Sequence, residues 1–535
     1  MNDDEILDAE IVETPESMSS ALPIRTNPLT PAVGVIALSL IFVTSMVIVF
    51  IDFSEPIDYE LIDFDQDRAR GYAQDLVDLG HSEWKGRMSG SAEEQAAAEY
   101  IMTTFESLGY QVELNTYDVP MHSINSEPSL RVCIPGSTTG FIAPCSLADI
   151  GAQITEFEHR IDYVIQGFSG QSDFQFNQDI TLTDLGNGTD DALWVSASGT
   201  IGIVDAGGSI GGNTGIMTKA VENDLLSIIR VNTNYNCGNI EGDDCVPIFK
   251  GTGIEDITAA NGGSIPADMA FIALSKDAGD ILKSAMIDNN ARLEMFIDVT
   301  NDQELTIRVP CGTMYGKSEE IVMAGGHHDT VYQGPGAIDD TSGTASVLEM
   351  ATQMSVIFAE KGEPERTVRF CTWGGEEEGL WGSRAYVEEN ADFLGQNLRL
   401  YVNLDMNHVD IDSETRGNSI TLFGNDERDM EHIEDITEQF KKERPDVASR
   451  YTINLNTLDG AKGESNGMPY NSDHGPFVYD LGEGIEGRAV VCYGSGSWEY
   501  HTYLDDMSRF NEESLGVSVV IYGSYLNYLA YSTNT

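Results

Sequence analysis

The chain has 535 residues, too many for one ordinary hydrophobic core, so we expect two or more domains. Its 88 acidic and 29 basic residues give a formal charge of -59 at pH 7, which argues against nucleic acid or anionic lipid as the main partner. The acidic residues are spread along the chain and 41% of all residues are hydrophobic, so a folded protein with a strongly acidic surface is expected.

The N-terminal region contains one long apolar run. Residues 1–31 are polar, acidic and without periodicity, and are predicted to be a disordered tail. Residues 32–51 contain no charged side chain and have the length of a membrane-spanning helix, about 20 residues. A cleavable signal peptide is less favoured, because no basic region precedes the run and no small-residue cleavage site follows it. Arg25 is the nearest basic residue, which predicts a single-pass protein of the cell membrane with an extracellular C-terminal part.

The predicted secondary structure changes character twice along the rest of the chain. Helical patterns and one strand up to residue 119 open an α/β domain. Gly-rich turns and short strands follow, which indicate an inserted β-rich domain. Strands and helices then alternate to the end, which predicts a mostly parallel mixed sheet with helices on both faces. The predicted domains are the tail 1–31, the membrane helix 32–51, the α/β domain 60–123 with 300–535, and the insert 124–299.

The seven cysteines divide into two kinds. Two close pairs in loop-like sequence are candidates for extracellular disulfides: Cys133 with Cys145, and Cys237 with Cys245. The others lie in or beside apolar strands and are expected to be small core residues: Cys311, Cys371 and Cys492. No CxxC spacing indicates a zinc site built on cysteine.

The stretch IVMAGGHHDTVYQGPGAIDDTSG, residues 321–343, organises the α/β domain. Its first four residues are typical of a buried strand, and His327 and Asp329 follow that strand. Asp339 lies ten residues after Asp329, in a Gly/Pro-rich loop before an amphipathic helix. Sites in open α/β sheets are built at the carboxyl ends of strands, and histidine nitrogen and carboxylate oxygen are ligands that zinc prefers.

Polar side chains recur in the same place after later strands. Glu376 and Glu377 follow the next predicted strand, Asp405 the one after it, and His501 a late one. Each residue alone is as well explained as a turn, helix-start or core residue, but their recurrence at successive strand ends favours a site. Carboxyl ends of parallel strands lie side by side, so these residues are expected to converge on an anionic pocket suited to two divalent ions.

These residues lie in segments that resemble family twenty-eight of the metallopeptidases, the co-catalytic zinc aminopeptidases. Relatives in that family include secreted leucyl aminopeptidases, carboxypeptidase Q and glutamate carboxypeptidase II. The resemblance covers residues 65–119 and 304–531, and the insert resembles more weakly a protease-associated domain. The matching segments, in the order of the family, are GGHHDTVYQGPGAIDDTSG, WGGEEEGLWGS, NLDM, SDHGPF and YHTYLDD.

The resemblance implies a zinc exopeptidase-like fold and two zinc ions per chain. It assigns His327 and Asp405 to one ion and Glu377 and His501 to the other, with Asp339 bridging them.

The resemblance also implies three residues with catalytic roles. Glu376 matches the general base, and Asp329 matches the carboxylate that orients the ligand His327. Tyr500 matches a tyrosine that steadies the tetrahedral oxyanion in some aminopeptidases. His328 lies at a variable position and receives no role.

The sequence therefore predicts a membrane-anchored zinc-dependent exopeptidase acting on peptides, with an aminopeptidase favoured because an anionic pocket holds a free α-amino group. The alternatives are a carboxypeptidase or dipeptidase, a glutaminyl cyclase of the same fold, and a non-catalytic binding protein. A carboxypeptidase or a dipeptidase would need cationic side chains near the substrate carboxylate, and no Arg cluster flanks the motifs. The cyclase relatives use a single zinc. Nothing in the sequence indicates an oligomeric state.

Overall fold

The computed structural model describes residues 57–533 except 137–142, 207–210, 241–244, 288–290, 411–412 and 414. The predicted tail (1–31) and membrane helix (32–51) lie outside the described residues. None of the helices within the described ranges is both long enough and apolar enough to cross a bilayer.

The central sheet is mixed, as predicted, and has eight strands in the order β1-β11-β13-β12-β14-β17-β15-β16. Neighbouring strands from β13 to β17 are parallel, as are β15 and β16, whereas β1/β11, β11/β13 and β15/β17 are antiparallel. The strands are β1 (Gln111–Ile124), β11 (Val299–Met314), β12 (Ile321–His327), β13 (Thr367–Trp373), β14 (Leu398–Leu404), β15 (Ser419–Gly424), β16 (Thr452–Thr457) and β17 (Ala489–Tyr493).

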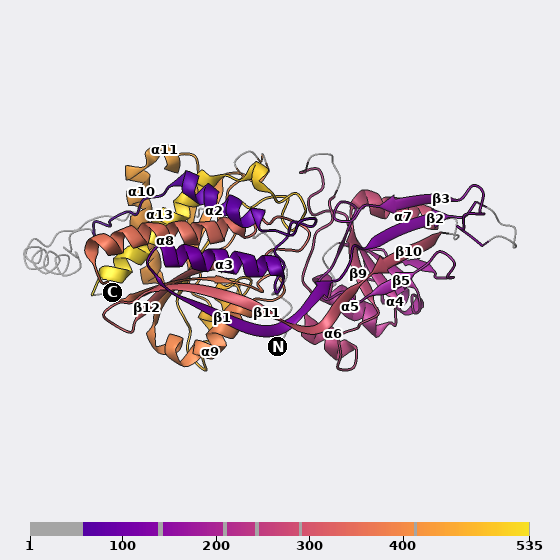
Figure 1. The fold of residues 1–535 in the computed structure, drawn as a ribbon, viewed down its shortest axis with the longest axis horizontal. Coiled ribbons are helices and arrows are strands. Elements are labelled where there is room, and N and C mark those ends of the chain that lie inside the picture. Colours follow the sequence, from indigo (N-terminus) through magenta and orange to yellow (C-terminus); the bar gives the residue numbers. More distant parts are fainter. Residues whose placement is uncertain are drawn as a thin grey trace, which may run out of the picture. The chain divides into compact units, whose positions relative to one another are not determined.

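Helices cover both faces of this sheet (Figure 1). All seven residues of β12 are buried, which explains why its sequence is an apolar run without alternation. One face carries α2 (Gln66–Asp78), α3 (Ala92–Ser107), α8 (Thr341–Lys361), α10 (Glu427–Glu443), α11 (Pro445–Ala448) and α13 (Glu512–Tyr531). The other carries α9 (Trp381–Asn397) and α12 (His474–Tyr479), and the short 3-10 helix η1 (Met507–Arg509) precedes α13.

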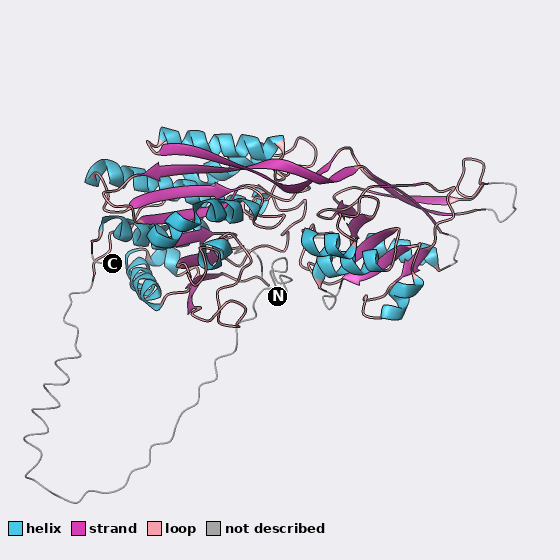
Figure 2. Ribbon diagram, turned by 90° about the horizontal axis from the view of Figure 1, so that it is seen from below, coloured by secondary structure: helices cyan, strands magenta, loops and turns pink. Residues whose placement is uncertain are grey.

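Residues 124–299, here called the middle block, form two further sheets. The long strands β1 and β11 stay paired up to Ile124 and Val299 and lead into this block (Figure 2). An antiparallel sheet contains β2 (Ser129–Ile134), β3 (Gln153–Phe157), β5 (Ser172–Phe174) and β10 (Arg292–Ile297). A mostly parallel sheet contains β4 (Tyr163–Ile165), β6 (Leu182–Asp184), β7 (Ile201–Ala206), β8 (Ser227–Asn232) and β9 (Ala270–Leu274).

The helices of the middle block are α4 (Asp191–Ser196), α5 (Gly212–Glu222), α6 (Ile254–Ala260) and α7 (Lys276–Met286). The two ends of the block coincide with the end of β1 and the start of β11. Its status as a separate inserted domain stays a prediction.

The cysteines correct one expectation. Cys133–Cys145 and Cys237–Cys245 are disulfides, and Cys492 is a free, buried thiol, as predicted. The prediction for the remaining two was wrong, because Cys311 and Cys371 are bonded to each other. They lie directly opposite each other on the antiparallel strands β11 and β13, with Cα atoms 4.2 Å apart. That pairing depends on strand order, which the local apolar pattern does not reveal.

Candidate metal centre

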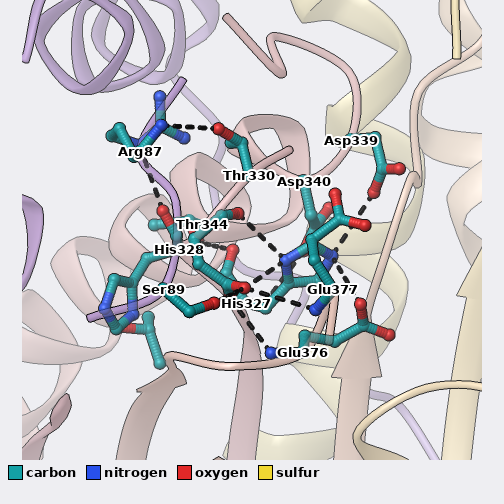
Figure 3. A network of polar contacts seen from close by, with 12 residues as sticks. Arg87, Ser89, His327, His328, Thr330, Asp339, Asp340, Thr344, Glu376 and Glu377 are labelled. Carbon is teal, nitrogen blue, oxygen red and sulfur yellow. Dashed lines mark hydrogen bonds and ion pairs between the residues drawn. The ribbon is translucent and has the colours of Figure 1, made fainter. Parts of the chain in front are cut away.

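The first histidine of the site ends a buried strand. His327 is the last residue of β12, and its side chain lies among the carboxylates at that end of the sheet (Figure 3). Its main-chain nitrogen donates to Asp340 Oδ2 (3.2 Å), and its carbonyl oxygen accepts from Thr344 Oγ1 (2.5 Å). Its ring Nδ1 lies 3.1 Å from the Asp329 carbonyl oxygen. Contacts within the chain therefore fix both the backbone and the ring of His327.

Asp339 lies between two histidines. Its Oδ1 is 3.3 Å from His327 Nε2, and its Oδ2 is 2.9 Å from His501 Nε2. The same His501 nitrogen lies 2.8 Å from Glu377 Oε2. The main-chain nitrogen of Asp339 donates to the Asp505 carboxylate (3.1 Å), which holds the loop. One carboxylate thus faces both histidines, the arrangement expected of a ligand that bridges two ions.

The candidate ligands form two buried groups. Within each group, ligand atoms from all three residues lie within 4.8 Å of one another. The groups are His327, Asp340 and Asp405, and Asp339, Glu377 and His501. The structure therefore brings together all five side chains that the sequence predicts as metal ligands, and it adds Asp340.

Asp340 joins three segments of the site. Its carboxylate accepts from the main-chain nitrogens of His327 (3.2 Å), Gly343 (2.9 Å) and Met406 (2.9 Å). It therefore ties the end of β12 to the start of α8 and to the residue after Asp405. This role is not among the predictions from the sequence, although an Asp three residues before Gly343, at the start of a predicted helix, has the position of an N-cap.

Asp329 fixes the loop that carries the two glutamates. Its Oδ1 accepts from the main-chain nitrogen of Glu376 (3.3 Å), and its Oδ2 accepts from that of Glu377 (3.3 Å) and from Ser89 Oγ (2.7 Å). Its Oδ1 also lies 3.5 Å from His327 Nδ1. Burial raises the pKa of Asp329, but the contacts with His327 and Ser89 outweigh it and hold that pKa below its usual range. An ionised Asp329 fits the predicted role of orienting His327.

The remaining polar residues around β12 are structural. The His328 ring contacts Thr372 Oγ1 (3.0 Å) and Glu94 Oε1 (3.1 Å), away from the ligand groups. Its carbonyl oxygen accepts from the buried Arg87 guanidinium (3.1 Å; Figure 3). The same guanidinium donates to Thr341 Oγ1 (2.6 Å).

The acidic groups of the site are crowded and buried. Burial raises the pKa of Glu376 well above its usual range, and the charges of Asp405 and Asp473 add to the effect while His327 opposes it. Burial likewise raises the pKa of Asp405 to about 6. Glu377 Oε1 is buried and has no hydrogen-bond partner among the described residues. A bound cation would satisfy that oxygen and the crowded charge, so these nitrogen and oxygen donors fit a divalent metal such as zinc.

The second histidine is held by distant residues. His501 lies in a loop with a left-handed backbone, φ 56°. Its Nδ1 is 2.9 Å from the Phe249 carbonyl oxygen, and its own carbonyl oxygen accepts from Phe249 N (3.1 Å) and Gln333 Nε2 (2.8 Å). Burial lowers the pKa of His501, but the charges of Glu377 and Asp339 outweigh it and raise that pKa to about 9.

Tyr500 packs beside this histidine. Its ring stacks on that of His501, with centroids 3.7 Å apart and planes 17° from parallel. Its hydroxyl accepts from Lys250 Nζ (3.1 Å). Burial raises the pKa of Tyr500 well above its usual range, so the phenol keeps its proton. Phe249 and Lys250 belong to the middle block, where no site residue was predicted from the sequence. Their contacts join residues about 250 positions apart, which a local sequence pattern does not reveal.

Comparison with known families and curated proteins points to one group. Residues 311–522 match Peptidase family M28. An aminopeptidase of Pseudomonas aeruginosa (strain UCBPP-PA14) is 24% identical over 490 residues, which are 86% of this chain and 80% of that protein. A probable leucine aminopeptidase 2 of Aspergillus oryzae is 36% identical over 141 residues, 26% of this chain and 27% of that protein.

Solved structures share the fold. The zinc aminopeptidase BSAP from Bacillus subtilis matches with a TM-score of 0.62 at 17% identity, covering 89% of this chain and 98% of that one. The aminopeptidase from Aneurinibacillus sp. strain AM-1 matches with a TM-score of 0.55 at 22% identity, covering 88% and 94%. At these sequence identities the likeness to solved structures shows a shared fold alone.

Proposed function

Because this chain belongs to peptidase family M28 and is a zinc metallopeptidase, we propose that it is an aminopeptidase that uses two zinc ions to remove N-terminal residues from peptides. The observation that carries the proposal is the Asp339 carboxylate, which faces His327 on one side and His501 on the other. We assign one zinc to His327 and Asp405 and the other to Glu377 and His501, with Asp339 shared.

These residues would hold zinc as a Lewis acid, which would polarise the scissile carbonyl and lower the pKa of a water molecule. Glu376 is the general base, which takes a proton from the attacking water and passes it to the departing amine. Its Oε2 lies 3.8 Å from His327 Nε2, so it faces the ligands without belonging to either group. Tyr500, as a protonated phenol, donates a hydrogen bond to the oxygen that becomes negative. Asp329 holds both the His327 ring and the loop of Glu376.

The acidic side chains of the metal centre favour substrates with a free α-amino group. A carboxypeptidase or dipeptidase would need a cation directed at the substrate carboxylate, and no Arg cluster flanks the sequence motifs of the site. A glutaminyl cyclase of the same fold would use one zinc, and a non-catalytic binding protein would hydrolyse nothing.

A fluorogenic peptide panel tests these statements together with zinc analysis. Peptides with a free amino terminus should be hydrolysed, N-acetylated versions should not, and the native protein should contain two zinc ions per chain. Preference for a free carboxyl terminus over a free amino terminus would identify a carboxypeptidase. One zinc per chain would favour the cyclase, and zinc-loaded protein without peptidase activity would favour a binding protein.

We further propose that residues 32–51 anchor the chain in the cell membrane with the remainder outside, and that residues 124–299 are an inserted protease-associated-like domain. The support is the uncharged apolar run, Arg25 before it and the weak resemblance of the middle block. Protease added to intact cells should digest the chain beyond residue 52. If the protease removed only residues 1–31, the chain would have the opposite orientation in the membrane.

A further inference from the structure

Two consecutive residues of the middle block contact two consecutive residues of the metal centre. The main-chain nitrogen and oxygen of Phe249 both bond to His501, at 3.1 and 2.9 Å. The next side chain, Lys250, is 9% exposed, and its Nζ lies 3.1 Å from Tyr500 Oη and 4.5 Å from the centroid of the Tyr500 ring. This segment therefore meets the ligand histidine and the proposed oxyanion donor side by side.

The backbone of Lys250 is fixed. Its nitrogen donates to Gln166 Oε1 (3.1 Å), and its carbonyl oxygen accepts from Asn213 Nδ2 (3.2 Å) and Gly167 N (3.1 Å). Asn213 also donates to Gln166 Oε1 (2.7 Å), and both side chains are buried. Lys250 thus projects toward Tyr500 from a rigid base, which reduces the entropy lost when its flexible side chain is ordered.

The chemistry of the contact sets its direction. A lysine ammonium has three donors and no acceptor, so the Tyr500 oxygen must accept in the bond with Lys250. A phenol carries a single proton, which then remains available to another acceptor. The positive charge beside the oxygen also makes the remaining O–H a stronger donor. The stacking of the Tyr500 ring on His501 restricts where the phenol oxygen can lie.

We propose that Lys250 is a positioning residue for Tyr500, holding the phenol oxygen as an acceptor so that its one proton is donated to the substrate oxygen that becomes negative during hydrolysis. The inference rests on the proposed function, in which Tyr500 stabilises that oxygen. It gives the middle block a part in the reaction, although none of the block's described residues belongs to the two ligand groups.

A double-mutant cycle on a peptide with a neutral N-terminal residue tests the inference. Tyr500→Phe should lower kcat by about 10²–10³-fold, the usual loss for one oxyanion donor. Lys250→Met should lower kcat by about 10-fold or more, with KM and zinc content near those of the wild type. The double variant should be no slower than Tyr500→Phe alone, because Lys250 acts only through the phenol. Lys250→Arg should recover part of the loss.

Lys219→Met is the matched control. It removes one lysine charge from the same block, where Lys219 pairs with Asp191 and lies over the Trp194 ring, and should leave kcat unchanged. If the losses of kcat in the two single variants multiplied in the double variant, the inference would be overturned. Loss of zinc in Lys250→Met would also overturn it. So would a rise in the KM of Lys250→Met confined to substrates with an extra carboxylate. Wild-type kcat in Lys250→Met would overturn it and leave the aminopeptidase intact. Inactive zinc-loaded wild type would instead reject the proposed function.

Discussion

The two histidines of the metal centre are held by different kinds of structure. His327 ends β12, and its backbone and ring are fixed by Asp329, Asp340 and Thr344, all within seventeen positions along the chain. His501 lies in a loop and is fixed by Phe249 and Gln333, 252 and 168 positions away. One half of the site is therefore built by local sequence at a strand end, and the other half depends on the middle block and on long-range contacts.

The strand-end half contains the group whose loss should cost the most activity. Glu376→Gln keeps the volume of the side chain and leaves every proposed zinc ligand in place. We expect zinc content to hold while turnover falls by about 10²–10⁴-fold, the usual contribution of general acid–base catalysis. Glu378→Gln is the control: the Glu378 carboxyl group contacts Ser89 Oγ and belongs to neither ligand group, so an amide of nearly the same volume should leave zinc content and most activity intact. Loss of zinc in Glu376→Gln would show that Glu376 is a zinc ligand and not the general base.

The neighbouring acid belongs to the His501 half and should respond differently. Glu377 Oε2 lies 2.8 Å from His501 Nε2, and a neutral amide is a poor zinc ligand. Glu377→Gln should therefore lose one zinc per chain, measured by elemental analysis, and regain part of its activity in excess zinc. Recovery of Glu376→Gln under the same conditions, or two retained zinc ions in Glu377→Gln, would mean that the roles are exchanged.

The same contrast explains how much the sequence could predict. The ligands converge because they follow successive strands, and strand ends are legible from apolar runs such as residues 321–324. Asp340 escaped notice because its carboxylate is used by three main-chain nitrogens from separate segments. Lys250 and the Cys311–Cys371 bond escaped because both depend on which distant segments pack together.

The third prediction compares the supports of the two histidines directly. Gln333→Met removes the hydrogen bond to the His501 carbonyl oxygen and should weaken zinc binding in that half by about 10-fold, at the lower end of the usual effect for groups that support a ligand. Asp329→Asn disturbs His327 and the main-chain nitrogens of both Glu376 and Glu377, so it should weaken both zinc ions. Stepwise removal of zinc by a chelator measures how tightly each variant holds its two zinc ions. Equal weakening of both ions in Gln333→Met would show that the halves are not independent.

The smallest effect concerns a residue beneath the His501 half. His122 is buried beside Phe168 and stacks on Phe249, with ring centroids 6.3 Å apart, and neither ring nitrogen has a hydrogen-bond partner among the described residues. Burial lowers the pKa of His122 to about 4, whereas the unfolded chain has the ordinary value of about 6.5. Between these pH values the unfolded state binds more protons, so this group makes the folded state less stable as the pH falls from about 6.5 to about 4.

His122→Leu removes that proton-linked difference and leaves every proposed metal ligand in place. At pH 7 activity should be unchanged, and the free energy of unfolding should rise by about 1–3 kcal/mol, because a buried ring without hydrogen bonds is replaced by an apolar side chain. Near pH 4 the advantage of the variant should grow by up to about 3 kcal/mol. Buried acids with raised pKa values, such as Asp405, act in the opposite sense in both proteins, so the difference between their unfolding curves isolates His122. A constant difference from pH 7 to 4 would show that His122 does not titrate in this window.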